Sequence, residues 1–251
     1  MLVLLLSDIH ANLEALEACV AAAPACDRVV NLGDVVGYGA NPNEVMDLVR
    51  SLGAVSLRGN HDKACAGTME LGTFNPIATL AAMWTRERLR PENLQELKDL
   101  PRGPLQLEGC QGAQFVHGSP LDEDEYLLTT VDGLEQLMRS PIPVTFFGHT
   151  HIQGGFAIEG NDGMALRPNF KHRDQAETYK QALRRDGRYL INPGSAGQPR
   201  DGDWRAAFAV FDCDKWVVTF FRVPYDVQRA QRKILAANLP ERLAQRLQEG
   251  R

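Results

Sequence analysis

The chain has 251 residues, of which 44% are hydrophobic and 24% are charged, and its formal net charge is −5. This composition is typical of a folded globular protein and argues against disorder. It also argues against duplex DNA or RNA as the main partner, because binding a phosphate backbone needs an excess of positive charge. The apolar run Leu2–Leu6 lacks a basic leader and is far shorter than the roughly 18 residues of a membrane helix. We therefore expect no membrane association and a cytoplasmic location.

Five cysteines are scattered along the chain without a CxxC pair. An odd number of cysteines without a secretory signal indicates reduced thiols rather than a disulfide framework. None lies in a motif with a nearby base, so a catalytic cysteine is the weaker interpretation. We expect partly buried, reduced side chains at Cys19, Cys26, Cys65, Cys110 and Cys213.

The first hundred residues alternate strand and helix patterns, as βαβ units do. A buried strand is predicted over Leu2–Leu6, followed by a helix that Asn12 caps and that turns Glu14 outward. A second strand is predicted over Arg28–Leu32. The next helix starts at Asn41-Pro42, with an N-cap and a proline at its first position, and it ends at Gly53; a third strand follows over Ala54–Leu57.

The segment Ala64–Leu100 changes character and predicts a helical excursion over the sheet edge, with a helix that opens at Asn75-Pro76 and stops at Pro91. Strands are then predicted over Ala113–Val116 and Val144–Phe147. A helix that starts near Asp132 separates them, with Leu134, Leu137 and Met138 on its apolar face.

The last third has a more antiparallel pattern. Strands over Tyr189–Asn192, Ala206–Asp212 and Lys215–Val223 suggest a second sheet. The polar stretch Lys171–Arg188 is interpreted as a surface helix with solvated arginines. Closing helices are predicted over 226–249, capped by Asp226 and started again by Pro240. We expect one domain over residues 1–251.

Residues with metal-ligand chemistry follow one strand after another. Asp8 and His10 come after the first strand and Asp34 after the second. Five of the six histidines take such positions, and only His172 does not. Because ligands bind outside the carboxyl ends of strands in open α/β sheets, we expect these side chains to converge. The remaining members of the set are Asn60, His61, His117, His149 and His151.

The chemistry of this set predicts a dinuclear metal site. Carboxylate, imidazole and amide oxygen without thiolate suit Mn, Fe, Zn, Co or Ni, of which we favour Mn, and argue against Ca or an all-oxygen Mg site. The set amounts to seven ligands plus one extra histidine, and seven ligands are too many for one tetrahedral ion. Two ions that share one carboxylate would each have four protein ligands, with room for a bridging hydroxide and the substrate.

Five sequence blocks resemble those of the calcineurin-like metallophosphoesterase family, and the downstream segments Asn192-Pro193-Gly194-Ser195 and Gln198–Asp203 resemble its bacterial phosphodiesterase-like branch. All five blocks are intact and in order. They are Asp8-Ile9-His10, Gly33-Asp34, Gly59-Asn60-His61-Asp62, His117-Gly118 and Gly148-His149-Thr150-His151.

The resemblance implies a fold and a set of roles. The fold is a four-layer αββα sandwich, in which helices lie outside two facing mixed β-sheets and the metal site lies at the carboxyl ends of the strands. Asp34 would bridge two ions, and His61 would be a non-ligand histidine that protonates the leaving oxygen. The implied ligands are Asp8, His10 and His151 for one ion, and Asn60, His117 and His149 for the other.

The implied reaction is hydrolysis of small phosphodiesters, cyclic nucleotides among them, by in-line attack of a metal-bridging hydroxide. Phosphomonoesters and dinucleoside polyphosphates are alternative substrates, and a non-catalytic scaffold on the same fold is the rival class. The partner is thus a small, nucleotide-like phosphate ester. The sequence assigns no substrate-binding residue and no oligomeric state.

The chain departs from the phosphatase branches of the family after Asp34. It reads Gly33-Asp34-Val35-Val36-Gly37-Tyr38-Gly39, so the second acid and the arginine found in those branches are missing, which leaves open what orients His61. Tyr38 is either a packing lid or a stacking surface for a base. Asn192 and Ser195 lie on a Pro-Gly turn that either joins two sheets or offers amides to phosphate.

Overall fold

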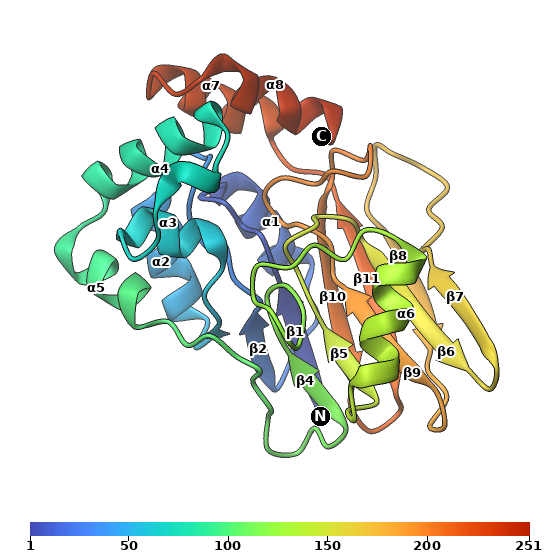
Figure 1. The fold of residues 1–251 in the computed structure, drawn as a ribbon. Coiled ribbons are helices and arrows are strands. Elements are labelled where there is room, and N and C mark those ends of the chain that lie inside the picture. Colours follow the sequence, from blue (N-terminus) through green and yellow to red (C-terminus); the bar gives the residue numbers. More distant parts are fainter.

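The computed structural model describes the backbone of residues 1–251 and every side chain except that of Thr73. Two mixed sheets face each other between outer helices, which gives the four layers implied by the resemblance (Figure 1). The first sheet has the order β3(Val55–Ser56), β2(Arg28–Asn31), β1(Leu2–Leu6), β10(Ala206–Asp212), β11(Val217–Val223), β8(Glu177–Ala182). The second has the order β4(Ala113–Phe115), β5(Val144–Phe146), β9(Arg188–Asn192), β6(Gly154–Glu159), β7(Asp162–Leu166).

Each sheet contains a parallel half and an antiparallel half. β1, β2 and β3 run parallel, and so do β4, β5 and β9. The other neighbours pair antiparallel, including β1 with β10 and β9 with β6. Because parallel strands end at the same edge, the loops that follow five of these strands meet at one end of the molecule.

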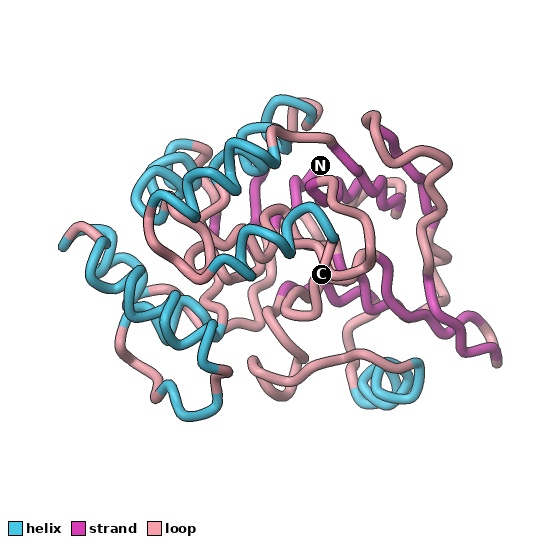
Figure 2. Tube along the Cα trace, turned by 90° about the horizontal axis from the view of Figure 1, so that it is seen from above, coloured by secondary structure: helices cyan, strands magenta, loops and turns pink.

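The helices are distributed unevenly over the two outer faces. Figure 2 shows most of them gathered on one side of the strands, with a single helix seen end-on at the other. That single helix is α6(Thr130–Arg139), which packs on Phe147 and Phe156 through a small apolar cluster. The larger group is α1(Leu13–Ala22), α2(Pro42–Ser51), α3(Asn60–Ala66), the 3-10 turn Leu71–Thr73, α4(Pro76–Arg88), α5(Pro91–Asp99), α7(Val227–Ala236) and α8(Glu241–Glu249).

A separate apolar core lies between the two sheets. Phe115, Phe146 and Phe211 are fully buried there, with ring centroids 5.0–5.4 Å apart along the series. Each such side chain stabilises the fold by about 1.5–3 kcal/mol relative to an exposed position. This core holds the two sheets together face to face and fixes how their strand ends meet.

Two expectations about the second half were wrong. Residues 177–182 form edge strand β8 rather than part of a surface helix, and the alternation of half-buried and exposed side chains along Glu177–Ala182 has the period of a strand. The late strands also do not form a sheet of their own. β10 and β11 extend the first sheet beside β1, whereas β9 joins the second sheet beside β5. Strands β6 and β7 were not predicted.

Several side-chain expectations were also wrong. Glu14 does not face solvent: it is buried, and its carboxylate lies 2.5 Å from Lys233 Nζ of α7. Met138 does not face inward: it is 65% exposed, whereas Leu137 is buried as expected and Gln136 is buried beside it. Asn41 precedes α2 without capping it and accepts a hydrogen bond from Lys233. For Glu14 and Asn41 a residue of a distant element, Lys233 of α7, sets the environment.

The expectation of five reduced cysteines was wrong for two of them. Cys110 and Cys213 form a disulfide with a Cα–Cα distance of 5.4 Å across 103 residues. It joins the segment before β4 to the residue after β10, so it links the two sheets at the end opposite the site. Cys19, Cys26 and Cys65 are free thiols. Within the described part of the chain, no helix combines the length and apolar character needed to cross a membrane.

Candidate metal centre

The strand ends bring all eight residues of the candidate set together. Six of them form two clusters of side-chain atoms that share Asp34, Asn60 lies next to one cluster, and His61 lies beside the other. The Asp8 group consists of Asp8, His10, Asp34 and His151, whose ligand atoms lie within 4.8 Å of one another. The His117 group consists of Asp34, His117 and His149 within the same distance, with Asn60 Oδ1 3.4 Å from His117 Nε2.

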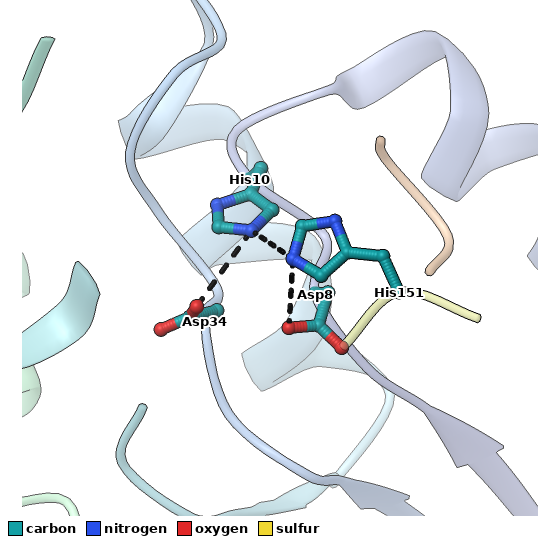
Figure 3. A group of neighbouring side chains, drawn as sticks. All are labelled: Asp8, His10, Asp34 and His151. Atoms are coloured by element: carbon teal, nitrogen blue, oxygen red, sulfur yellow. Dashed lines mark hydrogen bonds and ion pairs between the residues drawn. The ribbon is translucent and has the colours of Figure 1, made fainter. Parts of the chain in front are cut away.

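The side chains of the Asp8 group point toward one another from three loops (Figure 3). His10 Nε2 lies 3.1 Å from His151 Nε2 and 3.6 Å from Asp34 Oδ2. His151 Nε2 lies 3.2 Å from Asp8 Oδ1. Two carboxylates and two imidazoles thus surround one point, and this donor set suits a first-row divalent ion.

Hydrogen bonds to backbone carbonyls fix the tautomers of three histidines. His10 Nδ1 lies 3.2 Å from the backbone oxygen of Val36. His117 Nδ1 lies 2.9 Å from that of Leu32, and His151 Nδ1 lies 2.6 Å from that of Gln198. A carbonyl oxygen only accepts, so Nδ1 carries the proton in each ring. The lone pair is therefore on Nε2, which faces the Asp34 carboxylate in His10 and His117 and the Asp8 carboxylate in His151, as expected for a metal ligand.

Asp34 Oδ2 is the atom between the two groups. It lies 3.6 Å from both His10 Nε2 and His117 Nε2, and it is buried without a hydrogen-bond partner among the described residues. The other oxygen of Asp34 accepts from the backbone N–H of His61 at 2.8 Å. A buried carboxylate oxygen without a partner is costly, and a cation bound on either side would remove that cost. The donor set therefore fits a pair of metal ions that share Asp34.

The backbone of the site is held in a conformation that non-glycine residues avoid. Nine non-glycine residues have a positive φ, and five of them belong to the two groups: Asp8, His10, Asp34, His149 and His151. Each such residue costs on the order of 1–3 kcal/mol, which surrounding contacts must offset.

Two features supply such contacts around Asp34. The buried carboxylate of Asp62 accepts hydrogen bonds from the backbone N–H groups of Asp34, Val36 and Gly59. Gly59 allows the loops to approach, because a Cβ atom there would lie 2.0 Å from Asp34 Oδ1. Both residues belong to the block Gly59-Asn60-His61-Asp62, and no role was predicted for either from the sequence.

Electrostatics keeps the histidines neutral. Burial lowers the pKa of His10, His117 and His151, and it lowers that of His149 to about 2. Burial acts in the opposite direction on Asp34 and, together with Asp62 and Asp8, raises its pKa. Neutral imidazoles offer lone pairs to a metal without first losing a proton.

His61 lies beside the Asp8 group without belonging to it. Its ring centroid is 4.8 Å from that of His10 and 4.2 Å from that of Tyr38. Its Nδ1 is buried and has no hydrogen-bond partner among the described side chains. Packing against Tyr38 and Phe74, rather than an acid, therefore orients this ring.

The Pro-Gly turn after β9 braces the site rather than facing solvent. Asn192 donates to the Gly148 oxygen and to Thr150 Oγ1 between His149 and His151. Ser195 Oγ donates to the Asp8 oxygen at 2.7 Å. Both side chains are fully buried, so the turn holds the two ligand-bearing loops in place.

Comparisons with known proteins agree with this arrangement. Residues 1–216 match the calcineurin-like phosphoesterase superfamily domain. An uncharacterised protein of Methanocaldococcus jannaschii is 36% identical over 100% of this chain and 98% of its own length. The crystal structure of a metallophosphoesterase from Sphaerobacter thermophilus is 39% identical, with a TM-score of 0.80 over 100% of this chain and 99% of that one.

A hypothetical protein from Pyrococcus horikoshii shares the fold, with a TM-score of 0.80 at 20% identity over 100% of this chain and 98% of its own. The family is one of dinuclear-metal-dependent phosphoester hydrolases that act on small phosphate esters, and the buried Asp and His groups of this chain could bind the metals. The chain belongs to the calcineurin-like phosphoesterase superfamily.

Proposed function

We propose that the protein is a two-metal phosphodiesterase that hydrolyses small, nucleotide-like phosphate diesters. The observation that carries this proposal is the unpartnered Asp34 Oδ2, equidistant from His10 and His117. Asp8, His10 and His151 would hold one ion, Asn60, His117 and His149 the other, and Asp34 both. Manganese is the metal we favour, because imidazole and carboxylate ligands together suit it.

The bound metals would supply a nucleophilic hydroxide at neutral pH and stabilise charge on the phosphoryl oxygens. The protein itself positions the reaction. The fixed tautomers of His10, His117 and His151 keep the ligand geometry without reorganisation, and burial of the site excludes bulk water.

His61 would donate a proton to the leaving oxygen. Burial and the positive charge of Arg200 lower the pKa of this histidine, so it is neutral in the absence of substrate. A phosphate anion beside the ring acts in the opposite direction and favours its protonation. Substrate binding would thus prepare the acid that the reaction needs.

The same site would also accept phosphomonoesters or dinucleoside polyphosphates, which are our second choice. A non-catalytic scaffold is less well supported, because such a protein has no need of His61 and a full ligand set. The proposal further places the reaction in the cytoplasm and treats residues 1–251 as one domain.

The first experiment is hydrolysis of bis(p-nitrophenyl) phosphate and of p-nitrophenyl phosphate by chelator-stripped protein, with and without added Mn²⁺. Activity that returns with metal and favours the diester supports the phosphodiesterase. Preference for the monoester would shift the proposal to a phosphatase. Failure to cleave either ester with any first-row metal would favour the scaffold.

A second experiment tests the role of His61. We expect His61→Gln to lower kcat by about 10²- to 10⁴-fold for an alkyl leaving group while metal content stays unchanged. The loss should be smaller for p-nitrophenolate, which leaves readily without a proton. His172→Gln is the matched control, because this exposed histidine lies outside the site. Equal losses for both leaving groups would contradict proton donation.

A further inference from the structure

Two arginines flank Tyr38 at the edge of the Asp8 group. The guanidinium carbon of Arg200 lies 6.0 Å from the centroid of the Tyr38 ring, and that of Arg246 lies 5.8 Å from it. The same ring lies 4.7 Å from that of His10 and 4.2 Å from that of His61. The arginines are therefore one side chain away from the candidate metal centre.

Neither arginine has an aspartate or glutamate partner among the described residues. Arg246 Nε donates to the Arg251 oxygen at 2.8 Å, which leaves the two Nη groups of Arg246 for a ligand. This differs from two buried arginines nearby. Arg205 lies 2.6 Å from Asp203, and Arg222 pairs with Asp201. Asp201, which follows Arg200 in the sequence, thus pairs with Arg222, and no acidic side chain compensates the charge of Arg200.

The donors around Arg200 are also unsatisfied. Arg200 Nε is buried and has no hydrogen-bond partner, and the same holds for Nε2 of the buried Gln198. Arg200 Nη2 donates to two uncharged acceptors, Gln198 Oε1 at 3.2 Å and Tyr38 Oη at 3.5 Å. Buried donors without acceptors are costly, so this cluster lacks an acceptor that a ligand could supply.

Hydrogen bonds hold both arginines close to the site. The backbone N–H of Arg200 donates to the His151 oxygen at 3.1 Å, so the backbone of Arg200 is bonded directly to that of a candidate ligand. The Gly202 N–H donates to the Gly250 oxygen at 3.0 Å and ties this loop to the end of α8, which carries Arg246. Burial lowers the pKa of Arg246, and so does repulsion from the positive charge of Arg200 on the other side of Tyr38.

We propose that Arg200, Arg246 and Gln198 form a subsite for a second phosphate group of the substrate, next to the phosphate that is hydrolysed. This inference rests on the proposed function and narrows its substrate class. Two guanidinium groups without acids match the charge and the acceptor oxygens of a phosphate. The substrate would then carry at least two phosphates, as linear dinucleotides and dinucleoside polyphosphates do.

The test compares a substrate with one phosphate with substrates that carry two or four, using manganese-loaded protein. We measure kcat and KM for bis(p-nitrophenyl) phosphate, for a 5′-phosphorylated dinucleotide and for diadenosine tetraphosphate. Arg246→Gln and Arg200→Gln should raise KM for the two larger substrates by about 10- to 100-fold, the effect of losing a charge-assisted hydrogen bond. The ratio of this loss to that on bis(p-nitrophenyl) phosphate should exceed about five. The two larger substrates distinguish phosphates separated by a nucleoside from phosphates joined directly.

Two further variants serve as controls. Arg242→Gln removes an exposed arginine of the same helix that pairs with Glu249, and it should leave every constant unchanged. Arg246→Lys keeps the charge and should recover part of the lost affinity. Calorimetry with pyrophosphate, with Mn²⁺ in excess in both solutions, measures the subsite without catalysis, and we expect binding that Arg246→Gln weakens at least 10-fold.

The outcomes separate the two proposals. If bis(p-nitrophenyl) phosphate is not cleaved, the proposed function fails, while pyrophosphate binding still decides whether the subsite exists. If Arg246→Gln has the melting temperature of the wild type and changes KM equally for substrates with one phosphate and with more, the subsite is overturned. Equal pyrophosphate affinity in wild type and Arg246→Gln would overturn it as well.

Discussion

The two ligand groups share Asp34 but differ in burial and charge. The Asp8 group contains two carboxylates, Asp8 and the shared Asp34. Its members other than Asp34 are at most 1% exposed. The His117 group has only the shared carboxylate, and Asn60, which adds an uncharged oxygen beside it, is 9% exposed. One group is thus closed and more negative, and the other is more open.

The surroundings of the Asp8 group are also more closed than those of the His117 group. The loops after β1, β2 and β5 carry the Asp8 group, and the segment after β9 braces it through Ser195 and Gln198. In the His117 group, His149 Nε2 bonds to the Asp124 oxygen in a segment without helix or strand. Tyr126 of that segment stacks on His149 with centroids 3.8 Å apart and is 47% exposed. We expect the Asp8 group to bind its ion more tightly.

The largest effect should come from the residue that the groups share. Asp34→Asn removes the only carboxylate of the His117 group and one of two in the Asp8 group. We expect loss of both ions and a fall in kcat of at least about 10³-fold, because removing a catalytic metal removes charge stabilisation and the nucleophile together. Metal content by mass spectrometry and steady-state kinetics measure both. Asp186→Asn, an exposed acid that pairs with Arg184, is the control. Retention of two ions would contradict a shared ligand.

Single-group variants should separate the two ions. Asn60→Ala should release the ion of the His117 group and leave the ion of the Asp8 group bound. Asp8→Asn should lower the affinity for the ion of the Asp8 group. In the wild type, titration with a chelator should remove the ions in two steps, separated by about 10- to 100-fold in affinity. Loss of both ions in one step, or loss of both on Asn60→Ala, would remove the difference between the groups.

The stability of the metal-free protein should depend on pH through its buried histidines. Their folded-state pKa values lie below the unfolded value of about 6.5, and that of His149 is about 2. The unfolded chain therefore binds more protons below pH 6.5, so the free energy of unfolding should fall as the pH drops from 6.5 to 5. Burial raises the pKa of Asp62 to about 7 and also raises that of Asp34, so these two carboxyls offset part of the proton uptake by the five histidines. Urea unfolding of chelator-treated protein measures this slope, and a flat profile would be inconsistent with neutral buried imidazoles.

The smallest effect should come from a hydroxyl outside the ligand set. Ser7 Oγ donates to Asp8 Oδ2 at 2.6 Å and orients that carboxylate. We expect Ser7→Ala to weaken the ion of the Asp8 group by about 10-fold, with little change at the His117 group, because such outer contacts typically contribute 10- to 100-fold. Competition with a fluorescent chelator resolves this change. An equal effect on both ions would show that the groups are more strongly coupled than their contacts indicate.

The sequence by itself predicted much of the parallel half. Strands β1, β2 and β5 and the helix after Asn12 follow local patterns of burial and capping, which depend on residues close in the chain. Polar residues directly after buried strands then indicated a common edge, since parallel strands end together. For this reason the candidate residues could be named without knowledge of the tertiary structure, and the family was identified from the same blocks.

Tertiary structure decided the rest, because the responsible partners lie far apart in the chain. Strand β8 is polar and has no local signal, and it forms because β11 offers it an edge. Glu14 is buried because α7 brings Lys233 and Arg229 to it. The disulfide between Cys110 and Cys213 depends on two sheets that face each other. The arginines around Tyr38 are 46 residues apart, and the contact between the Gly202 loop and the end of α8 brings them together. Local sequence thus determined which chemistry each loop carries, whereas long-range packing determined what surrounds it.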